Sequence, residues 1–515
     1  VMMKARSYDR RFLIRGIKPN VFAIQESNGI ADIVRDELTP DAKMNAISQY
    51  LVETFEDAKE LGSIIATEQR DYDGYLAYLD NCEGNGQLSL EDTQWLSITR
   101  NLLKKLALQA KILSSKYPIV CTNPPYLNRM DSHLKDYITQ AYRAYSGDLF
   151  SVFMVRNFEL CERNGYTAFM TPFTWMFIKT YENLRNYIIE EKSITTIVQM
   201  EYSAFEEATV PICSFVLQNS NATRPSLCFR LSDFRGGMEV QKRKILQAIE
   251  DPNCGYFYEA DQMDFTQIPG TPIAYWVGAK LSSIFSSAHS LSEIGDVRIG
   301  MGTGNNALFL REWWEVNISK IDFNVNNING VQFSNGKYFP YGKGGDCRRW
   351  YGNQQKVVWY DLEGQCAMKN TSGHRENGGY DRYFQPSITW SYNTSAAFNA
   401  RYMPAGFVFD VNGSSIFLNS GEHNYILSFM LSCVCRLIVN VLNPTISVQA
   451  GNIRDLPILY GNKELVNSIA TECLEIEKTD WDDFETSWNF EVHPIVKKAL
   501  SRSHWNYDGA ITIEY

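Results

Sequence analysis

The chain has 515 residues, of which 44% are hydrophobic and 21% charged, so its composition is that of a globular protein and excludes a disordered or fibrous one. A chain of this length is too long to fold around a single hydrophobic core, so we expect two or three domains. The net charge of -10 argues against a basic surface that coats nucleic acid, but it leaves room for a local basic cleft.

Cysteine and histidine usage argues against a metal centre and against a disulfide framework. The eleven cysteines include no C-x-x-C pair, and none of the six histidines lies at ligand spacing from another. Scattered thiols are typical of the reducing cytoplasm. The most apolar stretch, 425–442, contains Arg436 and predicts one buried helix rather than a membrane span. We therefore expect a cytoplasmic protein with no metal and no membrane partner.

The first part of the chain predicts one short strand followed by helices. A turn ending at Asn20 leads into a predicted strand at 21–24. Apolar residues at three- and four-residue spacing then predict helices from about 29 to 115. Thr39 is expected to begin one of these helices and Ser89 another, because both residue types cap helix N-termini.

Strands and helices alternate between residues 117 and 218. The predicted strands are 117–121, 165–172, 194–200 and 211–218, and the predicted helices are 148–163 and 182–192. This alternation predicts an α/β fold with a mainly parallel sheet, in which the last two strands form an antiparallel pair at one end.

The composition changes after about residue 285, where Gly, Asn, Trp and Tyr become frequent. Such a composition favours short strands and long loops over strand-helix-strand units. We therefore predict a first domain over 1–285, with a helical insertion at about 30–116. A second domain is expected over 290–460, and a C-terminal extension over 461–515.

The stretch "YPIVCTNPPYLNRM" at 117–130 places two prolines and an amide directly after a strand that the pattern predicts to be buried. Each proline fixes its own φ and keeps the preceding residue extended. The side-chain oxygen of Asn123 and the carbonyl oxygen of Pro124, which precedes Pro125, are therefore acceptors with little freedom. They follow the carboxyl end of a strand, where α/β sheets bind ligands.

Two fixed acceptors suit an exocyclic amine that has two hydrogens to donate, such as that of adenine. Hydrogen bonds that draw the nitrogen toward tetrahedral geometry localise its lone pair and strengthen in the transition state. The aromatic ring of Tyr126 can stack on a base flipped out of a duplex, and Phe205 can cover its other face. The alternative is that Asn-Pro starts an ordinary turn and that Phe205 is a core residue.

Five stretches resemble motifs of the amino-methyltransferases that modify adenine in DNA. They are "IVCTNPPY" for the fourth motif, "SGDLFSVFMVRNFEL" for the fifth, "NGYTAFMTPFTWMF" for the sixth, "FEEATVPICSFVL" for the eighth and "KPNVFAIQE" for the third. The resemblance implies a Rossmann-like class I methyltransferase sheet and S-adenosyl-L-methionine as cofactor. It also implies that Asn123 to Tyr126 are catalytic and that Asn20 and Asp148 bind the cofactor.

Later stretches, among them "VRIGMGTGNNALFLREWWEV" and "KYFPYGKGGDCRRWYGN", resemble the target-recognition half of the PglX family. These proteins are the adenine-specific methyltransferases of BREX phage-defence systems. The resemblance implies a C-terminal mixed α+β target-recognition domain, with double-stranded DNA and other BREX components as partners. Arg348, Arg349 and Arg401 are expected to contact DNA, since arginine suits phosphates and guanine edges. The alternative places these arginines at the rim of a small core.

The family's cofactor glycines and the acidic residue after its second strand should precede Asn20, and residues 1–18 do not contain them. The chain therefore resembles a fragment whose first strands are missing, which by itself is expected neither to bind S-adenosylmethionine nor to methylate DNA. The strands at 21–24 and 117–121 would then lie side by side, with one edge exposed. The glycines at 300–306 suggest a permuted alternative, which "LFLREWWEVN" disfavours because it is a poor start to a glycine-capped helix.

The sequence thus favours a sequence-specific DNA adenine methyltransferase in a phage-defence system that resembles restriction-modification. One alternative is a catalytically silent DNA-recognition or assembly subunit on the same fold. Another is an RNA or protein methyltransferase, because the corner at Asn123 also suits a glutamine amide. The large second domain argues against this last alternative.

Overall fold

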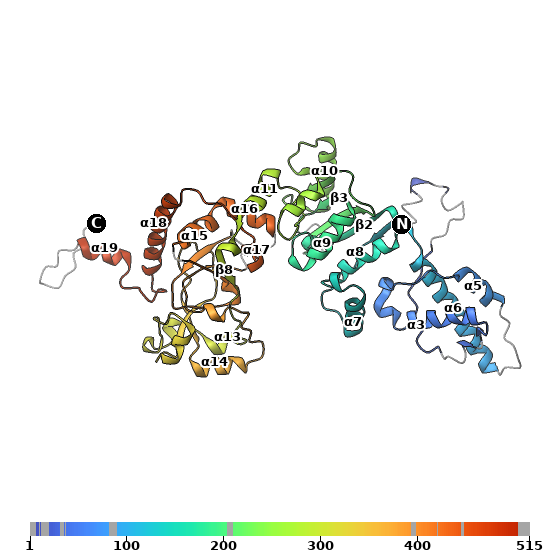
Figure 1. Cartoon of the computed structure of the whole chain (residues 1–515), viewed down its shortest axis with the longest axis horizontal. Coiled ribbons are helices and arrows are strands. Elements are labelled where there is room, and N and C mark those ends of the chain that lie inside the picture. Colours follow the sequence, from blue (N-terminus) through green and yellow to red (C-terminus); the bar gives the residue numbers. More distant parts are fainter. Residues whose placement is uncertain are drawn as a thin grey trace. The chain divides into compact units, whose positions relative to one another are not determined.

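The computed structural model describes residues 7–9, 11, 20–30, 35–36, 38–81, 90–202, 210–392, 398–419, 421–443 and 447–502 (Figure 1). The chain divides into two compact units. Unit 1 comprises Val1–Trp175 and Asn183–Ala260, and unit 2 comprises Met176–Glu182 and Asp261–Tyr515. The predicted change of domain near 285–290 lies inside unit 2.

Unit 1 combines helices with one six-stranded sheet. Its helices are α3 (Ala42–Thr54), α4 (Ala58–Leu61), α5 (Tyr72–Asn81), α6 (Leu90–Ser114), α7 (Ser132–Ala141), α8 (Leu149–Leu160), α9 (Glu182–Glu191) and α10 (Gly237–Glu250). Its strands are β1 (Tyr117–Thr122), β2 (Cys161–Pro172), β3 (Ser193–Gln199), β4 (Ile212–Gln218), β5 (Ser226–Arg230) and β6 (Phe257–Ala260).

The sheet of unit 1 is mixed: β1, β2, β3 and β5 run in one direction and β4 and β6 in the other, so the prediction was wrong in the position of the antiparallel strands. The strand order is β1-β2-β4-β3-β5-β6, with parallel pairs β1-β2 and β3-β5. The predicted antiparallel pair of β3 and β4 is present, but it lies inside the sheet because β4 also pairs antiparallel with β2. β4 therefore runs antiparallel between β3 and β2.

The helices predicted between 29 and 115 are present as α3, α5 and α6, and their apolar stripes form a buried core. Leu51, Tyr75 and Leu103 are fully buried, one from each helix. Arg156 joins this region to the sheet, because its buried guanidinium donates to the carbonyl oxygens of Ile65 (2.8 Å) and Leu113 (2.9 Å). The helical region is therefore packed against α8 and belongs to unit 1.

Three sequence predictions in this region need correction. The first residue of α3 is capped by Asp41, not by Thr39, because the Asp41 carboxylate accepts from two backbone N–H groups of the first turn. Residues 21–24 are not a strand: the next N–H, that of Gln25, donates to the side chain of Gln109 on α6 (3.0 Å). Ser89 lies outside the described residues.

Strand β1 is an edge strand of the sheet, and its only strand partner within the described part of the chain is β2. The expected neighbour at 21–24 does not pair with it. The sequence predicted a buried strand, whereas Ile119 is 64% exposed. An apolar run alone does not distinguish a central strand from an edge strand. Whether a strand is buried depends on which other elements cover its faces and its edge.

Unit 2 contains three sheets, of order β14-β10-β11-β9, β13-β12-β15-β8 and β16-β7. Its strands are β7 (His289–Ser290), β8 (Gly295–Arg298), β9 (Leu310–Glu312), β10 (Tyr338–Gly342), β11 (Lys356–Trp359), β12 (Ser387–Trp390), β13 (Ala400–Met403), β14 (Val408–Phe409), β15 (Ser415–Leu418) and β16 (Pro457–Ile458). Its helices are α11 (Ala279–Ser287), α12 (Leu291–Ile294), α13 (Asn306–Phe309), α14 (Leu362–Lys369), α15 (His423–Leu431), α16 (Cys433–Leu442), α17 (Ala450–Arg454), α18 (Lys463–Asp482) and α19 (Pro494–Arg502).

Two hydrophobic clusters form the core of unit 2. One lies among β8, β12, β13, β15 and the helices α15 to α17, with Trp390 and Ile426 at its centre. The other is largely aromatic and includes Phe339, Tyr383 and Phe409. Short strands and long loops dominate this unit, as the change in composition after residue 285 predicts.

The stretch 425–442, predicted as one buried helix, is in fact two helices. Helices α15 and α16 meet at Ser432 with an angle of 72° between them. Ser432 caps α16, since its hydroxyl accepts from the N–H of Cys435 (3.1 Å). By length and composition this bent pair passes a test for membrane spans, while no single helix among the described residues does.

Candidate active site and nucleic-acid interface

The corner at Asn123 lies at the carboxyl end of β1, where the last paired residues are Thr122 and Phe169 of β2. Residues Asn123 to Tyr126 have no helical or strand structure, as two successive prolines require. Pro124 is buried, whereas Asn123 is exposed. The amide side chain therefore stands at the surface on a stretch of backbone that is anchored by a buried ring.

The Tyr126 side chain lies against the side-chain oxygen of Asn123. Its hydroxyl is 3.3 Å from this oxygen and 3.2 Å from the carbonyl oxygen of Met170 on β2. One O–H shared between two distant acceptors makes weak hydrogen bonds, so an incoming amine can displace it. Burial, followed by the neighbouring Cys213, raises the pKa of Tyr126, so this hydroxyl stays a donor at neutral pH.

The ring of Tyr126 is 37% exposed and meets Phe150 of α8 edge-on, with 6.4 Å between the ring centroids. Phe150 is buried and holds the tyrosine ring from one side. Tyr126 therefore offers part of its ring to a ligand beside Asn123. Phe205, the predicted second aromatic, lies outside the described residues.

Asp148 holds the corner in place, because its Oδ1 is directed toward backbone N–H groups and not toward a ligand. It is the N-cap of α8, and its Oδ1 accepts from the N–H groups of Leu127 (2.9 Å) and Phe150 (3.2 Å). The carboxyl is buried, and this burial raises its pKa although hydrogen bonds from the backbone of Leu127, Phe150 and Leu149 act in the opposite direction. Asp148 thus connects the residue after Tyr126 to the helix that carries Phe150.

Replacing Asp148 separates its hydrogen bonds from its charge. Asp148→Ala should lower the free energy of unfolding of unit 1 by about 1–2 kcal/mol, since a cap and a loop contact are lost. Asp148→Asn should stay within about 0.5 kcal/mol of the wild-type value at pH 7, because one amide oxygen can accept both bonds. Urea unfolding with hydrogen exchange read on Leu149–Leu160 measures both differences.

The raised pKa of Asp148 also predicts how the stability of the chain changes with pH. The folded-state pKa of Asp148 is raised, so the folded chain holds the proton at pH values where the unfolded chain has lost it. The stability of the wild-type chain relative to Asp148→Asn should therefore rise as the pH falls from 7 toward the ordinary pKa of aspartate. A relative stability that falls with pH would show that the charged form is the one the fold prefers.

The two residues expected to bind the cofactor do not form its site. Asn20 is exposed and belongs to the segment that runs along the helices, and Asp148 is buried with its acceptor oxygen already occupied. Asp directly before "LF" is also a helix-capping signal, and this is the role of Asp148 that the structure displays. The described residues named for S-adenosylmethionine therefore do not fit this group.

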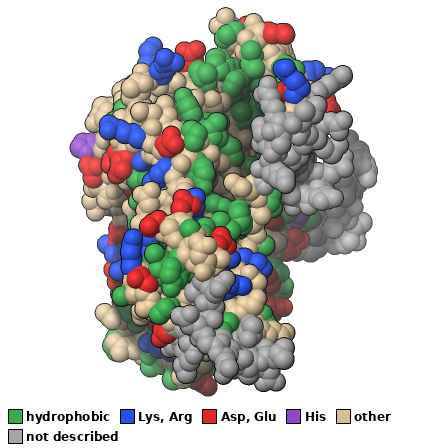
Figure 2. Space-filling view, turned by 90° about the vertical axis from the view of Figure 1, so that its right-hand side faces the viewer, with side chains coloured by type: hydrophobic (Ala, Val, Ile, Leu, Met, Phe, Trp, Pro, Cys, Tyr) green, Lys and Arg blue, Asp and Glu red, His purple; other side chains and the backbone are tan. Residues whose placement is uncertain are grey.

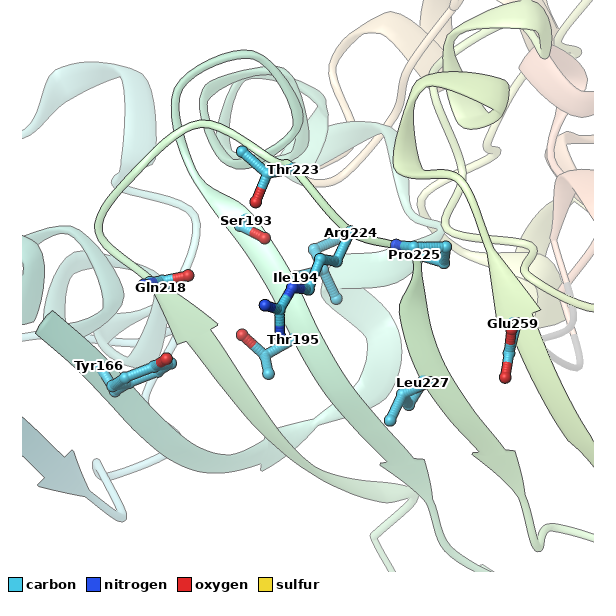
Figure 3. Close-up of a pocket in the computed structure, with 10 residues that line it drawn as sticks. All are labelled: Tyr166, Ser193, Ile194, Thr195, Gln218, Thr223, Arg224, Pro225, Leu227 and Glu259. Atoms are coloured by element: carbon cyan, nitrogen blue, oxygen red, sulfur yellow. The ribbon is translucent and has the colours of Figure 1, made fainter. Parts of the chain in front are cut away.

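A cavity of about 510 Å³ lies at the opposite end of the sheet from Asn123 (Figure 3). Its lining comes from the beginnings of β3 and β5, the ends of β4 and β6, and Tyr166 of β2. Tyr166 pairs with Ile119 and not with the end of β1, so the cavity is separated from the corner along the strands. Its residues contain none of those predicted to be catalytic.

In unit 2, the predicted arginines Arg348 and Arg349 lie in the loop 343–353, which we call the basic loop. Arg348 pairs with Asp480 of α18 (3.3 Å), and its guanidinium lies 4.9 Å from the ring centre of Trp481. Arg349 is exposed and makes no ion pair within the described residues. Arg349 is therefore available to an outside ligand, whereas Arg348 anchors the loop to α18.

The backbone of the basic loop is strained. Trp350 has a φ of +65°, a left-handed conformation that bulky residues rarely adopt. Hydrogen bonds on both sides hold it there: Trp350 N–H donates to Ala400 O (3.0 Å), and Tyr402 N–H donates to Trp350 O (2.7 Å). Such strain costs on the order of 1–3 kcal/mol and is concentrated at binding sites.

Arg401 is fully buried, so the prediction that it contacts DNA was wrong. Its guanidinium donates to Asn399 Oδ1 (2.7 Å) and to the carbonyl oxygens of Arg348 and Gly344 (both 3.3 Å). Burial lowers the pKa of Arg401 to about 10. Arg401 therefore supports the basic loop from beneath, in a role that the sequence does not distinguish from surface contact.

The glycines at 300–306 serve close packing of loops. A Cβ on Gly300 would lie 2.1 Å from the carbonyl oxygen of Phe409, and Gly304, at φ +76°, lies against the backbone of His374. Strand β8 precedes these glycines, but the helix after them, α13, has only four residues. A dinucleotide-type turn requires a long helix at this point, so the structure gives the permuted alternative no support.

Sequence reasoning missed two features of these sites. The carbonyl oxygen of Met170 has no side-chain signal and enters only through the pairing of β1 with β2. The pair of Lys343 and Asp410 (2.7 Å) joins residues 67 positions apart and was equally invisible. Within the described residues, no group of three or more His, Cys, Asp or Glu could hold a metal ion.

The surface seen from the side of α5 and α6 in Figure 1 mixes charges of both signs (Figure 2). Hydrophobic side chains lie in patches among the charged ones in this view (Figure 2). Trp95 (61% exposed) and Ile98 (51%) are exposed residues of α6. This face therefore carries no broad basic surface, which agrees with the net charge of -10.

Comparison with known proteins supports the sequence resemblance. The model of the Eco57I restriction-modification methylase family matches residues 31–205. The chain is 33% identical over 537 residues to the adenine-specific methyltransferase PglX of Lacticaseibacillus casei (strain Zhang), covering 98% of this chain and 43% of PglX. It is 32% identical over 533 residues to the adenine-specific methyltransferase BrxX of Escherichia coli O9:H4 (strain HS), covering 96% of this chain and 42% of BrxX.

A solved structure of the type IIL restriction-modification enzyme MmeI in complex with DNA aligns with 72% of this chain and 50% of that chain, at 10% identity and a TM-score of 0.47. The two curated relatives are longer, and the chain spans less than half the length of each. Identity at this level over nearly every residue of the chain reflects common descent. Over nearly its whole length, the chain is therefore a relative of one part of PglX and of BrxX.

Proposed function

We propose that this chain is the part of a DNA adenine methyltransferase that holds the target base and reads the DNA sequence. The observation that carries the proposal is the corner itself: an exposed amide at the carboxyl end of β1, fixed by two prolines, with an aromatic hydroxyl 3.3 Å from its oxygen. The names of PglX and BrxX, both adenine-specific methyltransferases, support the same chemistry.

In this proposal the target amine takes the place of the Tyr126 hydroxyl at Asn123. The Oδ1 of Asn123 and the carbonyl oxygen of Pro124 accept the two amine hydrogens, which localises the nitrogen lone pair for attack on a methyl group. Tyr126 then stacks its ring on the flipped base. Asp148 keeps Leu127 and Phe150 in place, so the acceptor and the stacking ring keep their spacing.

S-adenosyl-L-methionine would supply the methyl group in the whole protein. Because Asn20 and Asp148 do not form a site for it, the proposal assigns no residue of this chain to the cofactor. A positioned amine needs no strong base, since the proton leaves after the methyl group has been transferred. The contribution of the described residues is therefore to bind and orient the base.

Unit 2 is proposed to bind double-stranded DNA through the basic loop. Arg349 is exposed, and the loop around it is held by Arg401 from beneath and by the contact of Arg348 with α18. A rigid loop that presents a free cation is suited to a phosphate of the backbone. In the whole protein, the setting would be a phage-defence system with other BREX components.

The two neighbouring arginines provide the test of DNA binding. Arg349→Ala should lower the slope of log K against log salt by about 0.9, the value for one lost phosphate contact on duplex DNA. Arg348→Ala should leave that slope unchanged, because its charge is already paired with Asp480. Fluorescence titration of a labelled duplex at several salt concentrations measures both slopes.

Comparing Arg349→Ala with Arg348→Ala distinguishes the loss of a phosphate contact from a general loss of charge. Both variants remove one arginine from the same loop, so a general loss of charge would lower the slope equally in each. Equal slopes in Arg349→Ala and the wild-type chain would remove Arg349 from the DNA interface. A chain that binds no duplex at any salt concentration would contradict the proposed function of unit 2.

A further inference from the structure

A small polar pocket in unit 2 lies at the start of the basic loop, and Arg349 is not among the residues that line it. Its volume is about 230 Å³, and three loops line it through Gly302, Thr303, Gly304, Asn306, Lys343, Asp410, Val411 and Asn412. Strands β10 and β14 are parallel neighbours, so Lys343 and Asp410, which directly follow them, meet at one edge of their sheet. Met301 forms a parallel β-bridge with Asp410, and this bridge places the loop that contains Gly302 and Gly304 beside Asp410.

The charge of Lys343 is balanced inside the pocket. Asp410 is 2% exposed and accepts four hydrogen bonds: from Lys343 Nζ (2.7 Å), Tyr341 OH (2.7 Å), Asn412 N–H (2.8 Å) and Asn412 Nδ2 (3.0 Å). The ammonium group is therefore fixed in direction, and the pair carries no net charge. A pocket built for a phosphate would leave its lysine unpaired.

The orientation of both amides follows from these partners. Asp410 can only accept, so Asn412 turns its NH2 group toward the aspartate and its oxygen away from it. Lys343 can only donate, so the Asn306 oxygen faces the ammonium (3.4 Å) and the Thr303 hydroxyl (2.7 Å). The NH2 group of Asn306 then points away from these partners. Within the described residues it makes no hydrogen bond, and neither does the oxygen of Asn412.

The pocket thus offers two donors, the Asn306 amide and Lys343, and one acceptor, the Asn412 oxygen. Lys343 contacts both Asn306 and Asp410, and Asn412 contacts Asp410, so the two donors are adjacent and the acceptor lies at one end. In the major groove a G·C pair presents two acceptors on guanine, N7 and O6, and one donor on cytosine, N4. An A·T pair presents acceptors on both sides of its single donor. We propose that this pocket reads the major-groove edge of a G·C base pair, with Lys343, Asn306 and Asn412 as specificity-determining residues. The inference rests on the proposed binding of DNA by unit 2.

Gly302 provides a variant that closes the pocket without disturbing its network. A Cβ at Gly302 would meet its nearest neighbour, a methyl group of Val411, at 3.9 Å, and its φ is not in the left-handed region. Gly302→Ala therefore fits the fold and places a methyl group where the base edge would lie. Gly278→Ala is the matched control, since its Cβ also has open space and it lies outside the pocket.

The test selects bound sequences from a randomised duplex library with the 515-residue chain and its variants. The wild-type chain should enrich a consensus with at least one G·C position. Asn306→Ala and Gly302→Ala should lose the preference at that position by about tenfold and keep the rest of the consensus, while Gly278→Ala keeps all of it. Their salt slopes should equal that of the wild-type chain, because no phosphate contact is lost.

Four results would overturn the inference. An unchanged consensus in both Asn306→Ala and Gly302→Ala would remove the pocket from base recognition. An unchanged consensus with a salt slope lowered by about 0.9 would identify a phosphate contact instead. A wild-type chain that binds duplexes without any consensus contradicts the inference alone, whereas a chain that binds no duplex contradicts the proposed function as well.

Discussion

Asn123→Ala should reduce methylation of DNA by at least about a hundredfold in the protein as its host makes it, while duplex binding stays within about twofold. Removal of one hydrogen-bond acceptor that acts mainly in the transition state costs about 3–4 kcal/mol in comparable polar sites. Duplex binding is expected to persist because Asn123 faces the amine and makes no contact of the kind that binds phosphates. Sequencing of methylated adenines, together with a binding titration, measures both quantities.

Asn128→Ala is the matched control for this variant. It removes the same side chain from the same loop, and Asn128 is exposed without a hydrogen bond to the described residues. Its methylation should equal that of the wild type. If Asn123→Ala methylates DNA at the wild-type rate, the corner is only a turn and the proposed chemistry is wrong.

Arg401→Met should lower the free energy of unfolding of unit 2 by about 2–4 kcal/mol. Two effects compete in this variant. Removing a buried cation that has no carboxylate beside it relieves a desolvation cost. Against this, the guanidinium satisfies the buried side chain of Asn399 and the backbone carbonyl group of Arg348, and it is a second donor to the carbonyl of Gly344, which also accepts from Asn353 Nδ2 (3.1 Å).

The loss of hydrogen bonds should win, because each unsatisfied buried acceptor costs about 1–3 kcal/mol. Relaxation of the strain at Trp350 should offset part of this loss and leave the basic loop more mobile. Trypsin cleaves after Lys343, Arg348 and Arg349, so cleavage in this loop should accelerate in Arg401→Met. Arg349→Met, which changes an exposed arginine, should not accelerate cleavage at Lys343. A stable and protease-resistant Arg401→Met would show that the buried charge costs more than its contacts contribute.

The strand and helix positions of unit 1 could be predicted where the hydrophobic period was clear. Helices α8 and α9 and strands β2, β3 and β4 lie within a few residues of their predicted ranges. The strand order could not be predicted, because β4 enters between β2 and β3 through contacts between residues such as Phe169 and Phe215 that only the folded sheet brings together. The exposure of β1 depends likewise on its neighbours and not on its own apolar residues.

In the site, too, the sequence predicts what local backbone geometry determines, but not what contacts with distant segments determine. Two prolines constrain Asn123 by local geometry, so the sequence alone predicts a rigid corner. Asp148 and Arg401 were assigned to ligands because their residue types suit a cofactor and a phosphate. The structure instead surrounds them with backbone N–H and carbonyl groups from other segments, and burial turns both into supports of a loop.

We propose that the corner at Asn123 orients the exocyclic amine of adenine in DNA for methyl transfer. Mass spectrometry of nucleosides from the DNA of the host, with and without the gene, tests it most directly. The account predicts N6-methyladenine that disappears when the gene is deleted and that Asn123→Ala fails to restore. N4-methylcytosine in its place, or DNA whose nucleosides do not change on deletion, would contradict the account.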